Sequence, residues 1–228
     1  MKNTFLKIGV PVAVLFLYTL AAWFFDADLQ IARLIYVENE QWPGVNNFPW
    51  DFIYDYAVYP SFMLAGLSLI VLALGLYYTS LAKYRVQAIF LVLLLVLGPG
   101  LVVNSLLKDN HGRPRPREII EFGGKYEYSQ IWQKGATGKN SSFPSGHAAA
   151  GFYLIAPWFL FRRKNLPLAT GFLVFGMAYG SVVGAARIMQ GGHFLSDVVW
   201  AGGFVYLTGE FLALLLKTDH YSIREKTV

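Results

Sequence analysis

The chain of 228 residues contains no cysteine and few charged residues. The absence of cysteine excludes disulfide bonds and thiol chemistry, although it does not identify a compartment. Charged residues make up 14% of the sequence, whereas a soluble domain normally carries about 25%. Hydrophobic residues make up 55%, and the mean hydropathy is +0.43. This composition predicts an integral membrane protein. Because no Pro/Ser-rich or charged linker divides the chain, we expect a single membrane-embedded domain over residues 1–228.

Long apolar runs predict an all-α fold of six membrane-spanning helices. These runs are residues 8–25, 58–81, 87–107, 148–161, 167–186 and 198–216. A spanning helix needs about 20 mostly apolar residues, so the fourth run suffices only if Ser145, Gly146 and His147 begin its helix. Small residues allow helices in a membrane to approach closely. We expect this role for glycines of the last two runs, namely Gly171, Gly176, Gly180, Gly184, Gly202, Gly203 and Gly209.

The distribution of basic residues predicts the orientation. With six spans, one face receives Lys2, Lys7, Lys83, Arg85, residues 162–164, Lys217, Arg224 and Lys226. By the positive-inside rule this face is cytoplasmic, and both termini are expected there. Short basic clusters between apolar runs therefore explain the net charge of +5, and we expect no nucleic-acid partner. A cleaved signal peptide is the alternative for the first run, but bulky residues 23–25 follow the small pair Ala21-Ala22 and disfavour it.

The opposite, extracytoplasmic face receives residues 26–57, 108–147 and 187–197. The first of these segments mixes aromatic, aliphatic and acidic residues, which is typical of an interfacial amphipathic segment. We interpret it as a surface anchor, with a lid over a site as the alternative. The other two segments hold three short stretches of polar residues that can handle phosphate.

The first stretch has Lys108 and, after six further residues, Arg115 followed by Pro116. Lys and Arg donate hydrogen bonds without accepting any, and Arg can hold two phosphoryl oxygens at once. Taken alone, this pair would also suit cations that snorkel at a membrane boundary.

The second stretch is Pro144-Ser145-Gly146-His147, directly before an apolar run. The backbone N–H groups at a helix N-terminus bind anions readily, and the Ser145 hydroxyl would assist. Gly146 would let the backbone approach a ligand closely. The alternative is a plain Ser145 helix cap with His147 as a buried polar residue.

The third stretch places Arg187, His193 and Asp197 in order, with Gly191-Gly192 before the histidine. If the last helix begins near His193, then His193 and Asp197 are i and i+4 on one helix face. Asp197 can accept from one ring nitrogen and leave the other as a nucleophile. A structural His–Asp pair is the alternative, but ionisable residues gathered from three stretches of a membrane protein favour a functional site.

Together the three stretches resemble the signature of the type 2 phosphatidic acid phosphatase (PAP2) superfamily, over about residues 108–197. One position departs from the pattern, because the family usually has Ser where this chain has Ala186. The residues Gly112-Arg113-Pro114-Arg115-Pro116 and the six apolar runs resemble the bacterial membrane branch. That branch acts on phosphatidylglycerol phosphate, undecaprenyl pyrophosphate or lipid A.

The resemblance implies a lipid phosphatase that needs no metal and no cofactor, with a motif-bearing core of about residues 100–216. His193 would attack phosphorus and form a phosphohistidine, Asp197 would orient His193, and His147 would protonate the leaving oxygen. The phosphate would be bound by Lys108, Arg115, Ser145, Gly146 and Arg187. We assign no role to His111, and we interpret His220 as a tail residue. The loop 117–143 is expected to meet the lipid head group.

The predicted function is hydrolysis of a phosphate monoester or diphosphate from a membrane lipid, phosphatidic acid included, on the extracytoplasmic face of a bacterial inner membrane. A phosphotransferase that passes the phosphate of the same phosphohistidine to another lipid is the alternative, and the sequence does not separate the two. A non-enzymatic lipid transporter would show broken hydrophobic segments in repeated positions, and none is evident. The expected partners are the lipid substrate and the bilayer, and no protein partner is implied.

Overall fold

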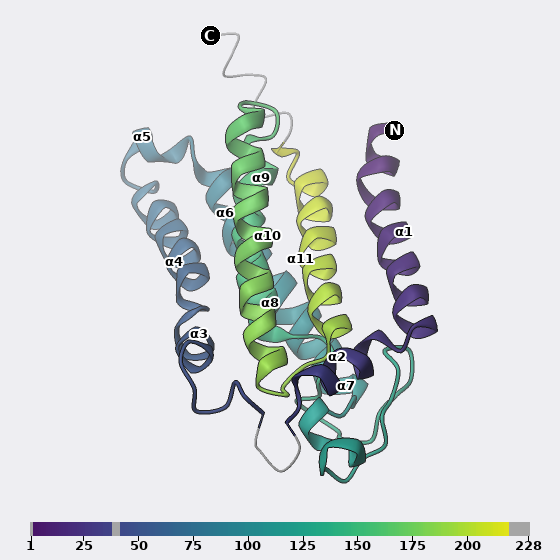
Figure 1. The fold of residues 1–228 in the computed structure, drawn as a ribbon. Coiled ribbons are helices and arrows are strands. Elements are labelled where there is room, and N and C mark those ends of the chain that lie inside the picture. The colour runs from purple at the N-terminus through teal and green to yellow at the C-terminus, as the bar shows by residue number, and fades with distance from the viewer. Residues whose placement is uncertain (1, 38–41, 219–228) are drawn as a thin grey trace.

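The computed structural model describes residues 2–37 and 42–218, which form a bundle of helices (Figure 1). The elements are α1 (Lys2–Phe24), α2 (Ala27–Ile35), α3 (Trp50–Tyr56), α4 (Tyr59–Leu74), α5 (Thr79–Ala82), α6 (Arg85–Leu95), the π-helix η1 (Val96–Lys108), α7 (Asp109–His111), the 3-10 helices η2 (Pro116–Glu118) and η3 (Ile120–Phe122), α8 (Gly146–Phe152), the 3-10 helix η4 (Tyr153–Ile155), α9 (Ala156–Phe161), α10 (Leu166–Met189) and α11 (Leu195–Leu215). Within the described residues, β-type pairing is limited to an isolated bridge between Ile119 and Tyr126. The all-α prediction is confirmed.

Within the described residues, five helical segments are long and apolar enough to cross a membrane. They are Leu6–Phe24, Trp50–Leu74, Arg85–Glu118, Leu166–Met189 and Leu195–Leu215. The fourth predicted run, Gly146–Phe161, forms a shorter apolar helical segment, so the six-span count stays a prediction. The second predicted run, residues 58–81, differs from the observed helix, which ends at Leu74. Beyond the helix end, Arg85 Nη2 donates to the Gly75 carbonyl oxygen at 2.7 Å and links the start of α6 to the end of α4.

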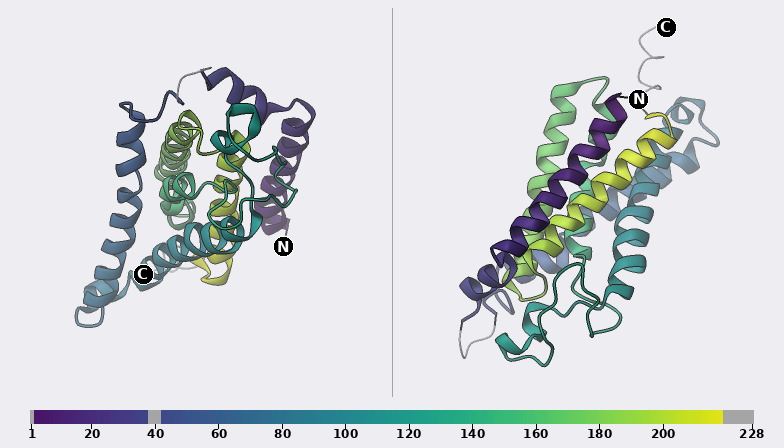
Figure 2. Two further views of the ribbon diagram at one scale, coloured as in Figure 1. Left: turned by 90° about the horizontal axis from the view of Figure 1, so that it is seen from below. Right: turned by 90° about the vertical axis from the view of Figure 1, so that its right-hand side faces the viewer.

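When the shorter segment α8–α9 is counted, successive helical segments run in opposite directions, so their connections gather at two ends of the bundle (Figure 1). One end holds the start of α1, α5, the α9–α10 turn and the end of α11, and it carries the basic residues Lys83, Arg85, Arg162, Arg163, Lys164 and Lys217. The other end holds α2, α7 and the loop 112–145 (Figure 2). The three proposed phosphate-handling stretches reach this second end. The predicted tail residues His220, Arg224 and Lys226 lie outside the described residues.

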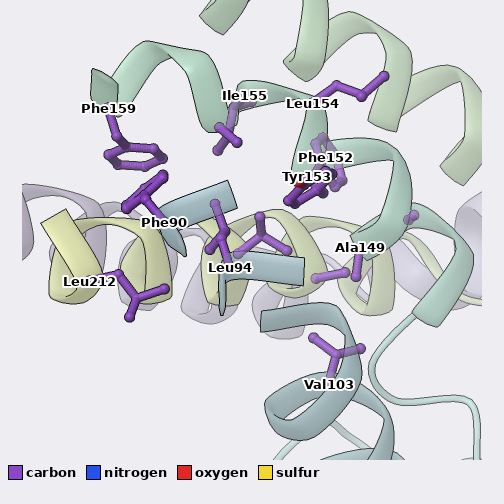
Figure 3. Packing of buried hydrophobic residues seen from close by; sticks show 14 of the residues in the cluster. Phe90, Leu94, Val103, Ala149, Phe152, Tyr153, Leu154, Ile155, Phe159 and Leu212 are labelled. Atoms are coloured by element: carbon purple, nitrogen blue, oxygen red, sulfur yellow. The ribbon is translucent and has the colours of Figure 1, made fainter. Parts of the chain in front are cut away.

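The apolar core is built around the segment Gly146–Phe161. Phe159 of this segment packs on Phe90 of α6, with 5.7 Å between the ring centroids (Figure 3). The buried Tyr153 donates its hydroxyl to the Leu91 carbonyl oxygen of α6 at 2.9 Å. This explains why a segment too short for an ordinary span is apolar on all sides, since neighbouring helices enclose it.

Glycines of α10 allow the core helices to approach closely, as the sequence predicts. A Cβ atom at Gly176 would lie 2.4 Å from Ile155 N, and one at Gly184 would lie 2.3 Å from Val198 Cγ1. Gly171 is different, because a Cβ atom there would meet open space. The packing interpretation therefore applies to glycines that face α8–α9 and α11.

Part of the segment 26–57 packs into the protein instead of lying free at a surface. Ala32 of α2 and Trp42 form a buried cluster with Ile119, Phe122 and Phe194. The interpretation of this segment as a simple surface anchor is therefore wrong for Trp42, whereas α2 buries Asp28 and Ala32 and leaves Leu34 85% exposed. The reason is that the loop 112–145 and the α10–α11 turn offer an apolar surface at the same end of the bundle.

Candidate active site

His193 lies in the turn between α10 and α11 and is 1% exposed. Its Nδ1 atom is 2.7 Å from the Ser142 carbonyl oxygen and 3.6 Å from Asp197 Oδ2. A carbonyl oxygen can only accept, so Nδ1 carries the proton and Nε2 holds the lone pair in the neutral ring. The sequence suggested Asp197 as the acceptor. The Ser142 carbonyl is closer because α11 begins at Leu195, which leaves His193 outside the helix.

Asp197 joins the second and third stretches. Its buried carboxylate accepts from Phe194 N at 2.7 Å, from Arg113 Nη1 at 2.5 Å and from the Ser142 hydroxyl. Its backbone carbonyl oxygen accepts from Ser145 N at 3.1 Å. Asp197 therefore holds Ser142, whose carbonyl oxygen accepts the hydrogen bond from His193 Nδ1, and its negative charge lies beside the His193 ring.

Arg113 is fully buried and links this carboxylate to α2. Its guanidinium donates to Ser129 O (2.9 Å), Ser196 Oγ (2.8 Å), Tyr128 OH (3.2 Å), Asp28 Oδ2 (2.8 Å) and Asp197 Oδ1 (2.5 Å). Asp28 Oδ1 also accepts from Ser196 N at 2.9 Å. Neither Asp28 nor Ser142 was predicted as a site residue, and Arg113 entered the prediction only as part of the stretch around Arg115. An extra arginine beside the motif was a signal for Arg113, whereas nothing in the sequence connects Asp28 to the site.

The environment keeps the His193 ring neutral. Burial, together with the positive charges of Arg187 and Lys108, lowers the pKa of His193 to about 3, against the opposing effect of Asp197. At neutral pH the ring is therefore unprotonated at Nε2, which is the form that can act as a nucleophile.

Lys108 and His147 line one cavity of about 330 Å³, which also touches α4 and η1. Lys108 is the last residue of the π-helix η1, which contains Pro99, a residue without an N–H to donate. Within η1, Asn104 Nδ2 donates to the Pro99 carbonyl oxygen at 2.7 Å. A Cβ atom at Gly146 would lie 2.4 Å from Asn104 Oδ1, so the Asn104 side chain would have to shift to make room for it. The close approach that Gly146 permits is thus to η1.

Ser145 caps α8. Its side chain is fully buried, and Oγ accepts from Ala148 N at 3.4 Å. Ser145 is therefore the plain helix cap that was the alternative interpretation of this residue. A phosphate-binding role for Ser145 stays a prediction.

Arg187 is 6% exposed and lies beside an aromatic ring from α3. Its Cζ is 4.4 Å from the centroid of the Tyr54 ring, and the same ring stacks on His147 at 4.7 Å. Arg187 Nη1 donates to Gln190 Oε1, and Gln190 Nε2 donates to Asp51 Oδ1 at 3.0 Å. Arg187 Nε is buried without a hydrogen-bond partner among the described residues. The residues of α3 were not predicted as part of the site.

Arg115 has a similarly incomplete set of partners. Its Nη2 donates to the Asn140 carbonyl oxygen at 3.1 Å, and its Nε is buried without a partner in the described part of the chain. The positive charges of Arg115, Arg187 and Lys108 are all close enough to the His147 ring to interact with it electrostatically. No described carboxylate lies within ion-pair distance of these three cations.

The arrangement therefore gathers three cations without carboxylate partners around two histidines, as a site for an anion would need. In residues 2–37 and 42–218, no group of three or more His, Asp or Glu side chains converges as a metal site. His111, which was assigned no role, has Nε2 at 2.6 Å from the Ile131 carbonyl oxygen and packs its ring on Phe143 at 4.8 Å. Ala186 is fully buried.

Curated relatives share part of this chain. A lipid A 4'-phosphatase of Francisella tularensis subsp. novicida (strain U112) is 38% identical over 143 residues, which cover 61% of this chain and 63% of the relative. A lipid A 4'-phosphatase of Rhizobium leguminosarum is 37% identical over 128 residues, which cover 55% of this chain and 52% of the relative. The chain thus spans less than two thirds of the length of these relatives. No solved structure shows a significant match.

A sequence profile of the PAP2 superfamily matches residues 87–221. This range contains Lys108, Arg115, His147, Arg187 and His193, and it is more than half of the chain. The predicted resemblance is confirmed, and the chain belongs to the PAP2 superfamily.

Proposed function

We propose that this protein hydrolyses a phosphate group from a membrane lipid through a phosphohistidine at His193. The observation that carries the proposal is the tautomer of His193, whose Nδ1 donates to the Ser142 carbonyl oxygen at 2.7 Å and leaves the lone pair on Nε2. Family membership and relatives named lipid A 4'-phosphatases support the reaction class.

In the proposed first step, the Nε2 lone pair attacks phosphorus as the bond between phosphorus and the lipid oxygen breaks. The leaving oxygen takes the electron pair, and His147 gives it a proton. Water then attacks the phosphohistidine, with His147 accepting a proton, and releases inorganic phosphate and free His193. Asp197 keeps the Nδ1 side of the ring in a negative environment throughout.

Three cations neutralise the charge that develops on the phosphoryl oxygens. Lys108, Arg115 and Arg187 have no carboxylate partner among the described residues, and Arg115 Nε and Arg187 Nε are buried without a hydrogen-bond acceptor there. Buried donors of this kind are costly unless a ligand satisfies them. The phosphoryl oxygens supply the acceptors, with Ser145 and Gly146 at the α8 N-terminus beside them.

We place the site on the extracytoplasmic face of a bacterial inner membrane. Six passes, with Gly146–Phe161 as the short fourth one, would put the basic end of the bundle and both termini in the cytoplasm. The basic end and the site lie at opposite ends of the bundle (Figure 1), which supports this orientation.

The direct test is phosphate release from purified protein in detergent across four lipids, with His193→Ala as the inactive control. Phosphatidic acid, phosphatidylglycerol phosphate, undecaprenyl pyrophosphate and lipid A are compared at equal concentration, with and without EDTA. We expect release from at least one lipid, undiminished by EDTA, and none from the variant. Equal release by wild type and variant, or release from no lipid, would overturn the proposal.

A further inference from the structure

A second concave surface, rich in cations, adjoins the candidate active site. It is a cavity of about 420 Å³ at the loop end of the bundle, lined by Arg115, Arg117, Lys125 and Lys139 and by one acidic residue, Glu118. Arg115 belongs both to this basic pocket and to the cations of the candidate active site. The two sites are therefore continuous through one guanidinium group.

The positive charge of the basic pocket is not balanced by the protein. No carboxylate among the described residues lies within ion-pair distance of its four cations. Glu118 is already engaged, because its Oε2 accepts from Arg115 N at 2.9 Å. Nearby, by contrast, exposed Arg33 does pair with Glu121. Four cations against one carboxylate in a concave surface attract anions more strongly than the same charges spread over a convex one.

Backbone hydrogen bonds hold the pocket in shape. Lys125 N and Tyr126 N both donate to the Glu118 carbonyl oxygen, at 2.9 and 3.0 Å. Arg117 N donates to the Gly191 carbonyl oxygen at 3.1 Å, in the turn that carries His193. The pocket is therefore fixed to the turn that carries the proposed nucleophile, and a ligand does not have to order it first.

We propose that the basic pocket binds a second anionic group of the substrate, so that the favoured lipid carries a phosphate in its head group besides the one that is removed. The inference rests on the proposed function, because the second group is placed relative to a phosphate bound near His193. A phosphate has acceptor oxygens only, which suits a pocket whose side chains are mostly donors. The pocket lies at the loop end of the bundle and so faces a head group.

The test uses the triple variant Arg117→Gln/Lys125→Gln/Lys139→Gln. These three side chains are exposed, so their replacement leaves the packed core untouched, and none of them is among the proposed catalytic groups. Lys134→Gln is the matched control, since Lys134 is an exposed cation of the same loop region outside the pocket. Each protein is assayed with two synthetic disaccharide lipids that differ only in whether a second phosphate is present.

For the bisphosphorylated lipid we expect the triple variant to lose about 10- to 100-fold in kcat/KM, mainly through a higher KM. For the monophosphorylated lipid we expect values within about twofold of wild type. The Lys134→Gln control should match wild type with both. Equal losses with both lipids, or no loss with either, would overturn the inference.

Two further outcomes distinguish a failure of the proposed function from a failure of the pocket assignment. If wild type releases phosphate from neither of these lipids nor from phosphatidic acid, the proposed function fails, and not only the pocket assignment. If bulk phosphatidylglycerol, which is anionic but carries no phosphate monoester, stimulates cleavage of the monophosphorylated lipid by wild type and not by the triple variant, then the pocket binds a neighbouring lipid. That result would overturn the assignment to the substrate itself.

Discussion

Replacing Arg113 by Gln should both destabilise the protein and stop turnover. The Arg113 side chain has no exposed surface and donates to Asp28 at 2.8 Å and to Asp197 at 2.5 Å. Glutamine cannot reach both carboxylates and brings no charge. Two buried carboxylates would then lose their shared counter-ion, and Asp197 would no longer hold Ser142 and the His193 ring in place.

The size of the effect follows from which charge is left unpaired. Removing one partner of a buried ion pair typically costs about 3–5 kcal/mol. Asp28→Asn is the informative comparison, because its amide oxygen can still accept from Arg113 or Ser196 N, and Arg113 keeps its pairing with Asp197. Loss of the charge assistance alone should cost about 1–2 kcal/mol. At about 2–4 °C per kcal/mol for a chain of this size, the apparent Tm should fall by about 6–20 °C for Arg113→Gln and by about 2–8 °C for Asp28→Asn.

The assay is thermal unfolding in one detergent at one scan rate, with kcat measured on the same preparations. Arg33→Gln serves as the control, since Arg33 pairs with Glu121 in an exposed position, where an ion pair contributes at most about 1 kcal/mol. Arg113→Gln should have kcat at least about 100-fold below wild type, and Asp28→Asn within about tenfold. If Arg113→Gln is as stable as Asp28→Asn, or turns over at the wild-type rate, the buried network does not position the nucleophile.

Three further predictions concern the reaction and its sidedness. His193→Asn should abolish turnover in a folded protein. Because the folded-state pKa of His193 lies below the unfolded value, wild type should lose stability as the pH falls below about 6.5. The Tm of the variant should fall less steeply with pH, and an unchanged slope would mean that His193 is not buried as a neutral ring. Arg187→Lys keeps the charge but loses the planar fork, and kcat/KM should fall by about 10- to 150-fold; a value within about twofold of wild type would reduce Arg187 to a snorkelling cation. Single cysteines in place of Lys134 and Lys83 should label oppositely in intact cells, Lys134→Cys from outside, and the reverse pattern would put the site in the cytoplasm.

The fold class and the family could be predicted from the sequence because both depend on local patterns. Apolar runs report burial in a bilayer wherever they occur, and the stretches around Arg115, His147 and His193 keep a recognisable spacing. Helix ends were predicted less well. The apolar run continues past Leu74, where the helix ends, and the bond that Arg85 donates to the carbonyl oxygen of Gly75 cannot be predicted from hydropathy.

The supporting residues of the candidate site could not be predicted, since their contacts join distant parts of the chain. Tyr54 and Asp51 come from a segment that hydropathy presents as an interface, yet Tyr54 stacks on His147 and Asp51 accepts from Gln190. The Nδ1 partner of His193 is a backbone carbonyl oxygen, which has no side-chain signature at all. The sequence suggested Asp197 as the partner because its carboxylate follows His193 by four residues, which is the spacing of neighbours on a helix face.

The Asp28–Arg113–Asp197 network also determines when, during synthesis of the chain, the candidate site can form. Asp28 and Ser196 hydrogen-bond across 168 residues of sequence, and Arg113 reaches Asp197 across 84. During synthesis, α2 and Arg113 are made long before the last helix exists, and their partners on α11 arrive last. The ring orientation of His193 therefore cannot be set while the chain is still growing. A truncated product that lacks α11 would keep the pair between Arg113 and Asp28, but Arg113 would lack its bonds to Ser196 and Asp197 and the network would stay incomplete.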